Sequence, residues 1–426
     1  MNYRIDKVNA WNGWDPLKQV MLGNCFSPDW FRDVKDSSLR KMIQTLVSDT
    51  MEDLDGIQRT LENLGVDVVR IPENTIENGW NMDDEGIDSW GKYNEYINDN
   101  ELDFLRRYWK NGLPKPMITP RDYWITLGNK FVQTSNHAGV KSLAKRGLIN
   151  PDIVEGFTDD FREEQWRRDG YPSRGPLKLS KNYKKEVAPD WEPGWDTLTR
   201  DPDTQPYKSW DNPAYMDYAF QTFGFWAPII TRVGNRLIVD HEDYTNLGKV
   251  LLGMYPDFDQ TTVAIGGHND GTFCTPKPGH IITANWHTDY KMTFPGWKVH
   301  VVDNPETMDH DSFRRWSDYK FDANKTVKWW QEGAHASPEY IQFVEEWMNK
   351  WVGMVEETVF EVNMLSVSED TILCLNNNES VHEHLRSIGL TPIHCRFRNR
   401  HFWDGGLHCL TVDTVREGGK QNYFGN

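Results

Sequence analysis

The sequence predicts an α/β fold assembled from repeated small strand–helix units in a single domain. First, apolar residues between Leu39 and Leu64 recur every three or four positions, which is typical of a long amphipathic helix. Second, short β-rich runs precede and follow this stretch, so strand, helix and strand form one α/β unit. Third, further strands recur along the chain, with reactive side chains at their turns. These features predict one repeat-built domain over residues 1–426.

In the N-terminal part, an Asp-Pro turn within residues 11–24 leads into a short apolar strand. The long helix ends at Gly65, since glycine readily adopts the left-handed conformation that follows a last helical turn. Residues 66–71 alternate loosely and stop at Pro72, which predicts a second strand. Residues 116–129 predict a turn followed by a β-hairpin.

The C-terminal part continues with elements of the same kind. The predicted elements are two strands about a Gly-Asn turn (229–240), a helix (244–254), a strand (261–265), a helix (338–358), a strand pair (363–374) and a short helix (381–388) capped by Gly389.

Three long polar segments interrupt this series, near residues 73–115, 150–210 and 303–356. They are irregular in pattern and rich in tryptophan. Aromatic side chains can pin such segments to the body of a protein. We therefore expect insertions that lie on the surface of the single domain, because loops of this length are usually functional or disordered.

Composition excludes several classes of function. A net charge of -17 is unfavourable for binding nucleic acid or an anionic membrane. The sequence has neither an apolar run long enough to span a bilayer nor the apolar core of a signal peptide at its start. Its five cysteines stand singly, without a CxxC pair. This predicts reduced thiols, a cytoplasmic location and no metal site or other cofactor.

Cys409 is a candidate nucleophile. It follows the pair Gly405-Gly406, whose missing side chains allow a tight turn and leave room for a ligand. The β-rich run after it can hold the thiol rigidly, and a covalent catalyst needs a thiol that reaches an electrophile unobstructed. The alternative is an ordinary buried cysteine beside a turn, which is how most free cysteines behave.

Three further residues suit the same chemistry. His268 and Asp270 follow a predicted strand, and residues two apart on a strand share a face, so both can enter one cavity. A histidine near a thiol can accept and return a proton. With Asp122, Asp270 supplies two carboxylates that can hold a planar guanidinium. Taken alone, Asp122 is more often a turn-capping residue, and the His-x-Asp pattern recurs at His287.

Together these motifs resemble the glycine (arginine:glycine) amidinotransferases of the guanidine-modifying pentein superfamily. The matching blocks occur in the family's order along most of the chain: Trp14–Leu17, Pro120–Asp122, His268–Phe273, Arg398–Asn399 and Gly405–Thr411. The resemblance implies a five-bladed, pseudo-symmetric α/β propeller, with the long segments as insertions. It also implies an enzyme that moves an amidino group from arginine or a related guanidine to an amine.

Site roles follow from the resemblance, residue by residue. Cys409 would carry the amidino group, and His268 would be the general acid and base. Asp122 and Asp270 would hold the guanidinium. The substrate-binding site would also include Arg398, Asn399 and His287. His287 is in addition the rival of His268, but only His268 is followed by Asp-Gly-Thr-Phe, as in the family.

Some expected family residues are missing. No acid stands at residues 225–228, where the family has one that orients the histidine, so either Asp217 or Asp240 substitutes for it or the histidine is oriented differently. Asn285 or His287 replaces an arginine that grips the substrate carboxylate, and Glu356-Glu357 replaces paired serines. These changes favour a substrate that lacks an α-carboxylate or carries extra positive charge. A guanidine hydrolase and a non-catalytic guanidine-binding protein remain alternatives, and a homodimer is left open.

Overall fold

Five three-stranded sheets form the described part of the fold. The computed structural model describes residues 3–32, 34–72, 116–134, 143–144, 146–156, 227–240, 255, 257–263, 268–283, 290–303, 337–348 and 359–424. In every sheet the middle strand pairs antiparallel with one neighbour and parallel with the other. The same small unit is therefore repeated five times, which confirms an α/β fold with mixed sheets.

The sheets, each in spatial order, are β15 (Thr411–Arg416), β1 (Leu17–Leu22) and β2 (Asp67–Arg70); β3 (Trp124–Leu127), β4 (Lys130–Gln133) and β5 (Val154–Gly156); β6 (Ile230–Val233), β7 (Arg236–Asp240) and β8 (Asp259–Val263); β11 (Lys298–Val301), β10 (His280–Thr283) and β9 (Phe273–Lys277); and β12 (Leu365–Ser366), β13 (Thr371–Cys374) and β14 (Thr391–His394). No closed sheet joins these described strands, so the five-bladed propeller stays a prediction.

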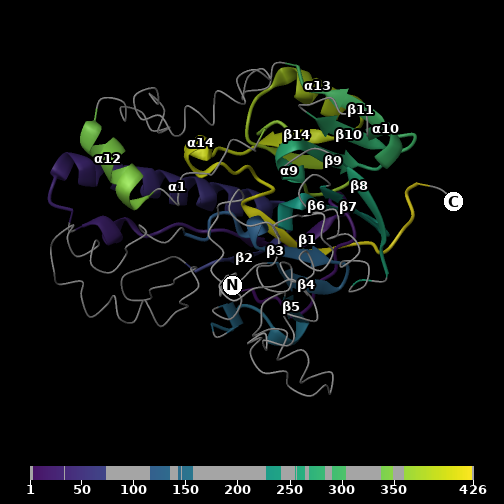
Figure 1. The fold of residues 1–426 in the computed structure, drawn as a ribbon, viewed down its shortest axis with the longest axis horizontal. Coiled ribbons are helices and arrows are strands. Elements are labelled where there is room, and N and C mark those ends of the chain that lie inside the picture. Colours follow the sequence, from purple (N-terminus) through teal and green to yellow (C-terminus); the bar gives the residue numbers. More distant parts are fainter. Residues whose placement is uncertain are drawn as a thin grey trace, which may run out of the picture.

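The helices differ greatly in length, and Figure 1 shows α1 beside α12 and α14, away from most of the sheets. They are α1 (Ser37–Asn63), α9 (Asn269–Thr272), α10 (Tyr290–Thr293), α12 (Pro338–Trp347), α13 (Glu379–Ser387) and α14 (Arg400–Trp403). Single 3₁₀ turns lie at Pro28–Phe31, Pro120–Asp122, Pro151–Ile153 and Ala227–Ile229.

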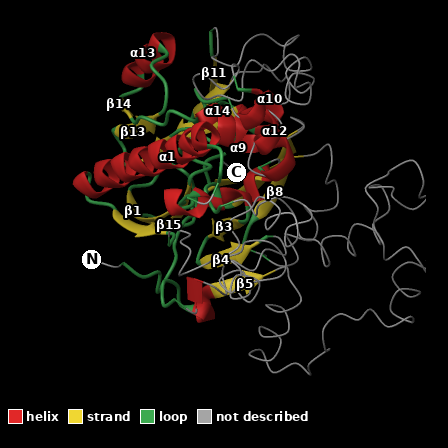
Figure 2. Ribbon diagram, turned by 90° about the vertical axis from the view of Figure 1, so that its left-hand side faces the viewer, coloured by secondary structure: helices red, strands yellow, loops and turns green. Residues whose placement is uncertain are grey.

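Helix α1 covers the sheet in which the first and last described strands, β1 and β15, pair with each other (Figure 2). The Asp36 side chain caps its N-terminus by accepting a hydrogen bond from the Leu39 amide at 2.8 Å. Gly65, with φ of +80°, lies just beyond its C-terminus. Its apolar stripe, including Leu46 and Ile57, is fully buried in a core that also contains strand β1. The predicted helix and its stop at Gly65 are thus confirmed, and burial of that stripe stabilises the sheet below.

Most other predicted elements also form. The strands near the N-terminus, the hairpin after residue 120, the strand pair about Gly234 and the C-terminal strands and short helix are all present. The predicted helix at 244–254 lies outside the described residues, as does the end of the predicted helix at 338–358 beyond residue 348.

The long polar segments are only partly described. Residues 73–115 lie outside the described chain, and the other two segments are described at 150–156, 303 and 337–348. Strand β5 and helix α12 fall within these ranges, and both belong to the packed fold.

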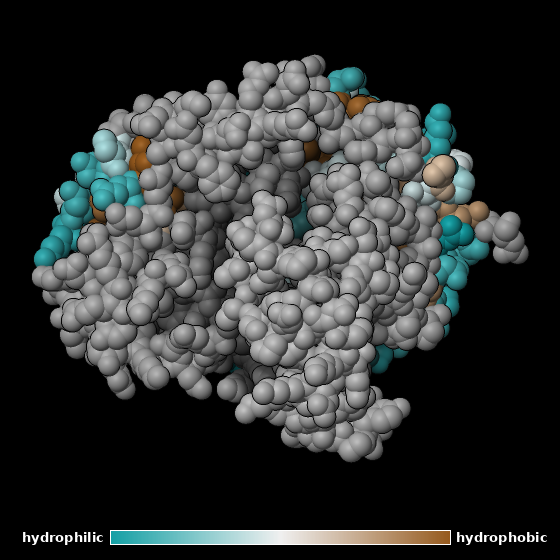
Figure 3. Space-filling model, viewed as in Figure 1, coloured by the Kyte–Doolittle hydropathy of each residue, from teal (hydrophilic) through white to brown (hydrophobic). Residues whose placement is uncertain are grey.

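Hydrophilic side chains predominate among the described residues visible in Figure 3, which agrees with the low mean hydropathy of the sequence. Among the described helices, none combines the length and apolar character needed to cross a membrane.

Three histidines pack together where α13 crosses the sheet of β10 and β11. The rings of His300 and His384 stack at 3.9 Å between centroids, and His280 lies 6.3 Å from His384. Each ring has one buried nitrogen without a hydrogen-bond partner among the described residues. Burial lowers the pKa of all three, and at His384 burial together with the charges of His300 and His280 lowers the pKa to about 4.

We therefore expect acid to destabilise this contact. The folded pKa of His384 lies below its value of about 6.5 in an unfolded chain. The neutral His384 ring therefore makes its full contribution to the free energy of unfolding above about pH 6.5. It is lost as the pH falls from about 6.5 toward 4, where the unfolded chain binds more protons. His384→Gln should lower proton uptake on unfolding over this range by about one proton.

Urea unfolding at a series of pH values tests this expectation. The neighbouring charges that also act on the cluster, Lys277 and Lys298 beside His280 and Asp303 beside His300, stay unchanged in the variant. Wild-type and variant proteins should have the same pH dependence above pH 7. An unchanged slope below pH 6.5 would contradict the assigned role of His384.

Candidate active site

Cys409 is buried in the turn between α14 and β15, and Asn363 holds it in place. The Asn363 Oδ1 atom accepts hydrogen bonds from the backbone amides of Cys409 and His408, at 3.1 and 2.9 Å. Its Nδ2 group donates to Cys409 Sγ at 2.9 Å and to the Asp270 carbonyl at 2.9 Å. One amide side chain therefore fixes both the backbone and the sulfur of the candidate nucleophile.

The two glycines before Cys409 are required by close packing. A Cβ at Gly406 would lie 2.6 Å from Asn363 Oδ1, and a Cβ at Gly405 would lie 2.7 Å from Thr119 Cγ2. The pair allows the tight turn that the sequence predicted, but Asn363 and Thr119 occupy the space that was predicted for a ligand. The glycines thus serve to place the thiol against its amide partner.

Gly406→Ala is expected to displace Asn363 and to lower the free energy of unfolding by about 1–3 kcal/mol, the usual effect of overpacking. Alkylation of the Cys409 thiol should slow as well, because its amide partner moves. Denaturant unfolding and peptide mapping after alkylation measure the two effects. Gly419→Ala is the matched control, because nothing lies within 4 Å of a Cβ at that position. Equal behaviour of the two variants would contradict the packing argument.

Asp270 contacts the thiol directly. Its Oδ2 atom lies 3.5 Å from Cys409 Sγ, whereas Oδ1 is buried and has no hydrogen-bond partner among the described residues. The prediction that His268 and Asp270 alternate on a strand was wrong. His268 is instead the N-cap of the single-turn helix α9, and Asp270 lies in its first turn. The nearby positive charge of His268 is nonetheless one of the influences that lower the pKa of Asp270.

Asp122 lies close enough to the thiol to act on its pKa, although it is far from Cys409 in the sequence. It ends the 3₁₀ turn Pro120–Asp122, and Thr119 donates a hydrogen bond to it at 2.6 Å. The backbone amide of Arg121 donates to the carbonyl of Cys409 at 3.3 Å and ties this turn to the nucleophile. The structure thus brings Asp122, Asp270 and Cys409 together.

The surroundings disfavour a thiolate. Burial raises the pKa of the Cys409 thiol well above its ordinary value, and the charges of Asp270 and Asp122 raise it further. Hydrogen bonds from Asn363 and from the backbone at Gly406 act in the opposite direction but are weaker. The site therefore holds a protonated thiol beside two carboxylates, an arrangement that a bound cation would change.

The fold is shared with a solved amidinotransferase. SxtG, an amidinotransferase of the saxitoxin biosynthetic pathway from Microseira wollei, superposes with a TM-score of 0.50 over 98% of this chain and 99% of its own, at 14% identity. The chain therefore shares the overall fold of this protein. The inosamine-phosphate amidinotransferase StrB1 from Streptomyces griseus covers the same shares at 14% identity, with a TM-score of 0.49.

The sequence match to a curated relative covers a much shorter segment than the structural superposition does. The L-arginine:L-lysine amidinotransferase of Pseudomonas savastanoi pv. phaseolicola is 31% identical over 76 residues. This segment is 18% of the present chain and 19% of that relative's length. No family model matches the chain.

Within this amidinotransferase fold, Arg398 and Asn399 contact helix α1. Arg398 pairs with Asp49, Glu52 and Asp53, and its backbone amide donates to Asp53 at 2.7 Å. Asn399 donates to the carbonyl of Leu46 at 3.3 Å. These contacts fasten the segment before Cys409 to the helix, so the proposed substrate site does not include either residue.

The remaining sequence candidates fall where the structure describes no side chain. His287, Asn285, Asp217 and the pair Glu356-Glu357 lie outside the described residues, and the Asp240 side chain is not described. Among the described residues, no three His, Cys, Asp or Glu side chains converge as metal ligands would.

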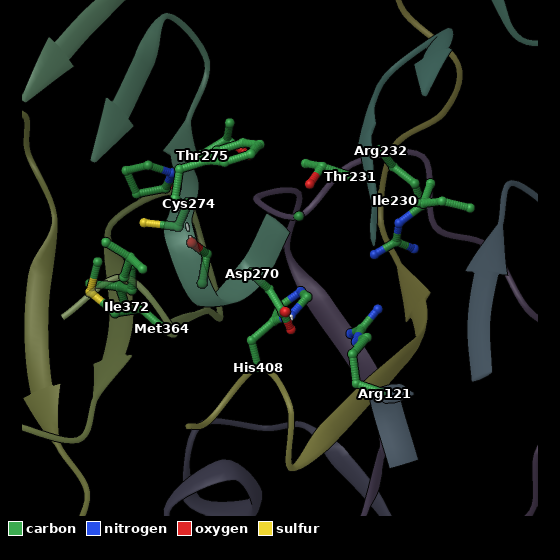
Figure 4. A pocket seen from close by; sticks show the side chains of 15 residues that line it. Arg121, Ile230, Thr231, Arg232, Asp270, Cys274, Thr275, Met364, Ile372 and His408 are labelled. Atoms are coloured by element: carbon green, nitrogen blue, oxygen red, sulfur yellow. Dashed lines mark hydrogen bonds and ion pairs between the residues drawn. The ribbon is translucent and has the colours of Figure 1, made fainter. Parts of the chain in front are cut away.

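A small cavity of about 50 Å³ lies on the far side of Asp270. Figure 4 shows Asp270, His408, Arg121 and Arg232 facing one another across it, between strand β6 and strand β9. The two arginines, together with Arg416, all donate to the buried Asp413 at 2.6–2.8 Å. They hold the pKa of Asp413 well below its usual range, against the effect of burial.

Sequence reasoning missed Asn363, His408 and this arginine cluster. Asp413 stands four residues after Cys409, and an acid so close to a nucleophile in an apolar run was an available signal. Arg416 stands three residues after Asp413, but Arg121 and Arg232 are 292 and 181 positions away, and no local pattern connects them. Asn363 is 46 positions from Cys409 and gave no signal.

Proposed function

We propose that this protein is an amidinotransferase that moves an amidino group from arginine or a related guanidine to an amine, through a covalent amidino-cysteine on Cys409. The observation that carries the proposal is the buried Oδ1 of Asp270, which has no hydrogen-bond partner among the described residues, on a carboxylate whose Oδ2 lies beside the thiol. A buried carboxylate oxygen without a donor is unfavourable, and a guanidinium N–H would satisfy it. The shared fold with SxtG supports the same chemistry.

Binding of a cation would activate the nucleophile. The carboxylates of Asp270 and Asp122 oppose ionisation of the Cys409 thiol in the empty site. A guanidinium held between them neutralises their charge and lowers the thiol pKa, since an opposite charge at close range favours the ionised form. The thiolate therefore forms mainly when the donor is bound, which protects it from unproductive reactions.

The transfer then proceeds in two halves. The thiol passes its proton to His268, and the sulfur forms a bond to the guanidino carbon. Collapse of the tetrahedral intermediate breaks the carbon–nitrogen bond to the donor, whose amine takes the proton from His268. The acceptor amine later attacks the amidino-cysteine and gives a proton to His268, and the carbon–sulfur bond breaks. The leaving sulfur takes this proton from His268, so the thiol and the histidine return to their starting states.

We further propose that the chain is a single catalytic unit whose five sheets are the blades of a propeller. The pairing pattern common to all five sheets supports this arrangement. A cytoplasmic location also belongs to the proposal, because all five cysteines are free thiols. A hydrolase that uses water in place of the acceptor amine remains the alternative within the same chemistry.

Intact-mass measurement after incubation with arginine tests the proposal. An amidino group on sulfur adds about 42 Da under a covalent thiol mechanism, and Cys409→Ala should show no addition. Amines are then added, and the released products are analysed. The aligned relative is named for arginine and lysine, so lysine is the first acceptor to test, followed by diamines and glycine.

Product analysis separates the candidates. Ornithine together with a newly guanidinylated amine supports transfer, whereas citrulline and ammonia, or ornithine and urea, support a hydrolase. If no donor gives an adduct or product, and Cys409→Ala binds guanidines as tightly as the wild type, the chain is a guanidine-binding protein instead.

A further inference from the structure

His408 lies directly before the candidate nucleophile and contacts Asp270. Its Nδ1 atom is 2.7 Å from Asp270 Oδ2, the oxygen that also lies 3.5 Å from Cys409 Sγ. The other carboxylate oxygen, Oδ1, has no partner among the described residues. The two oxygens of Asp270 are thus unequal, since His408 occupies one and leaves the other for a ligand.

The protonation states set the direction of this hydrogen bond. Burial alone would raise the pKa of Asp270, but the hydrogen bond from His408 and nearby positive charges lower it overall. Burial and the charge of Arg121 lower the pKa of His408, against the effect of Asp270. At neutral pH Asp270 is therefore an acceptor-only carboxylate. His408 is a neutral imidazole that carries its proton on Nδ1 and donates it.

The backbone of His408 is fixed with the rest of the site. Asn363 accepts from the amides of His408 and Cys409 and donates to the carbonyl of Asp270. One amide side chain, that of Asn363, therefore holds the backbone of all three residues. A ring held this way can impose a single orientation on the carboxylate it contacts.

We propose that His408 is a positioning residue, which holds Asp270 Oδ2 so that Oδ1 faces the guanidinium of the substrate. This inference rests on the proposed function of the site. Arg121 is the competitor that makes such positioning necessary. It is a cation that lines the same cavity, and Figure 4 shows it to the right of Asp270. Without the donor at His408, the carboxylate is free to turn from the thiol toward Arg121.

Two alkylating reagents distinguish positioning from packing. 2-Chloroacetamidine is a planar amidinium that needs the Asp270 carboxylate, whereas iodoacetamide is neutral and does not. With each reagent the sulfur bonds to the methylene carbon, the halide leaves and the thiol proton is released to solvent. Peptide mapping follows the reaction at Cys409 separately from the other cysteines.

The variants are His408→Leu, which removes the donor, and His408→Asn, whose amide nitrogen can stand near the position of Nδ1. His408→Leu should slow reaction with chloroacetamidine by about 10- to 100-fold, the loss expected for one hydrogen bond to a charged group. Its reaction with iodoacetamide should change less than about threefold. His408→Asn should retain most of the wild-type rate with both reagents.

The pH dependence adds a measurement that a packing role would not change. Loss of the hydrogen bond raises the pKa of Asp270, so the acid limb of the chloroacetamidine profile should move to higher pH in His408→Leu and not in His408→Asn. Equal slowing with both reagents, or no slowing in His408→Leu, overturns the positioning role. If the wild-type protein shows no preference for chloroacetamidine over iodoacetamide, the proposed guanidinium site is refuted. The positioning role of His408 is then refuted with it.

Discussion

Replacing Cys409 with serine is expected to lower the rate of amidino transfer by roughly a thousandfold or more, as removal of a covalent nucleophile does in other enzymes. A buried serine hydroxyl beside two carboxylates stays protonated, and it is the weaker nucleophile. The loss should appear in kcat, because Asp270 and Asp122 remain in place to hold the guanidinium. Steady-state kinetics with the donor and acceptor identified by product analysis measure it.

Cys274→Ala is the control for this variant. Cys274 lines the cavity on the far side of Asp270, and burial raises the pKa of its thiol far above the ordinary value. Its replacement should leave transfer nearly unchanged. Comparable losses in the two variants, or near-normal turnover in Cys409→Ser, would show that Cys409 is not the nucleophile.

Asp413→Asn should give the largest loss of stability, about 3–5 kcal/mol in the free energy of unfolding, the range seen when one partner of a buried ion pair is removed. Asp413 accepts from Arg121, Arg232 and Arg416, and all four side chains are at most 3% exposed. Burial already lowers the pKa of Arg232 to about 10, although Asp413 opposes this shift. A neutral amide would leave three buried cations without a counter-charge.

Thermal and urea unfolding measure this loss. Glu379→Gln is the matched control, because it removes a carboxylate from the exposed ion pair with Arg386 and should leave the unfolding midpoint unchanged. Loss of Asp413 should also reduce the reactivity of Cys409, since Arg121 ties the Cys409 backbone to the turn at Asp122. A variant as stable as the wild type would show that the arginines are neutralised in another way.

Sequence patterns predicted the elements with strong periodicity and failed where a structure depends on distant residues. Helix α1 has a long apolar stripe and a glycine stop, so its bounds were accessible. The single turn α9 is too short to show a helical period, and His268 and Asp270 were placed on a strand. Local order in so short a segment is decided by its tertiary contacts.

The candidate site likewise combines residues that local motifs predicted with residues that only the fold brings together. Cys409 and Asp270 were predicted from motifs and lie in contact, whereas Asn363 joins them through the fold alone. Arg398 was assigned to the substrate site because a resemblance cannot show which neighbour a side chain finds. Asp49, Glu52 and Asp53 stand three and four residues apart on one helix face, and that acidic face was a usable sign of a basic partner.

The sheet that contains β15, the strand after the thiol, has a consequence for biosynthesis. Strand β15, which begins two residues after Cys409, pairs with β1, and Asn9 contacts Arg416 across 407 positions of sequence. A nascent chain therefore exposes one edge of β1 until β15 has been synthesised and can pair with it. An open strand edge is a site for unwanted pairing with other chains. The reactive thiol reaches its final position only when β15 joins β1, long after the first strand has been made.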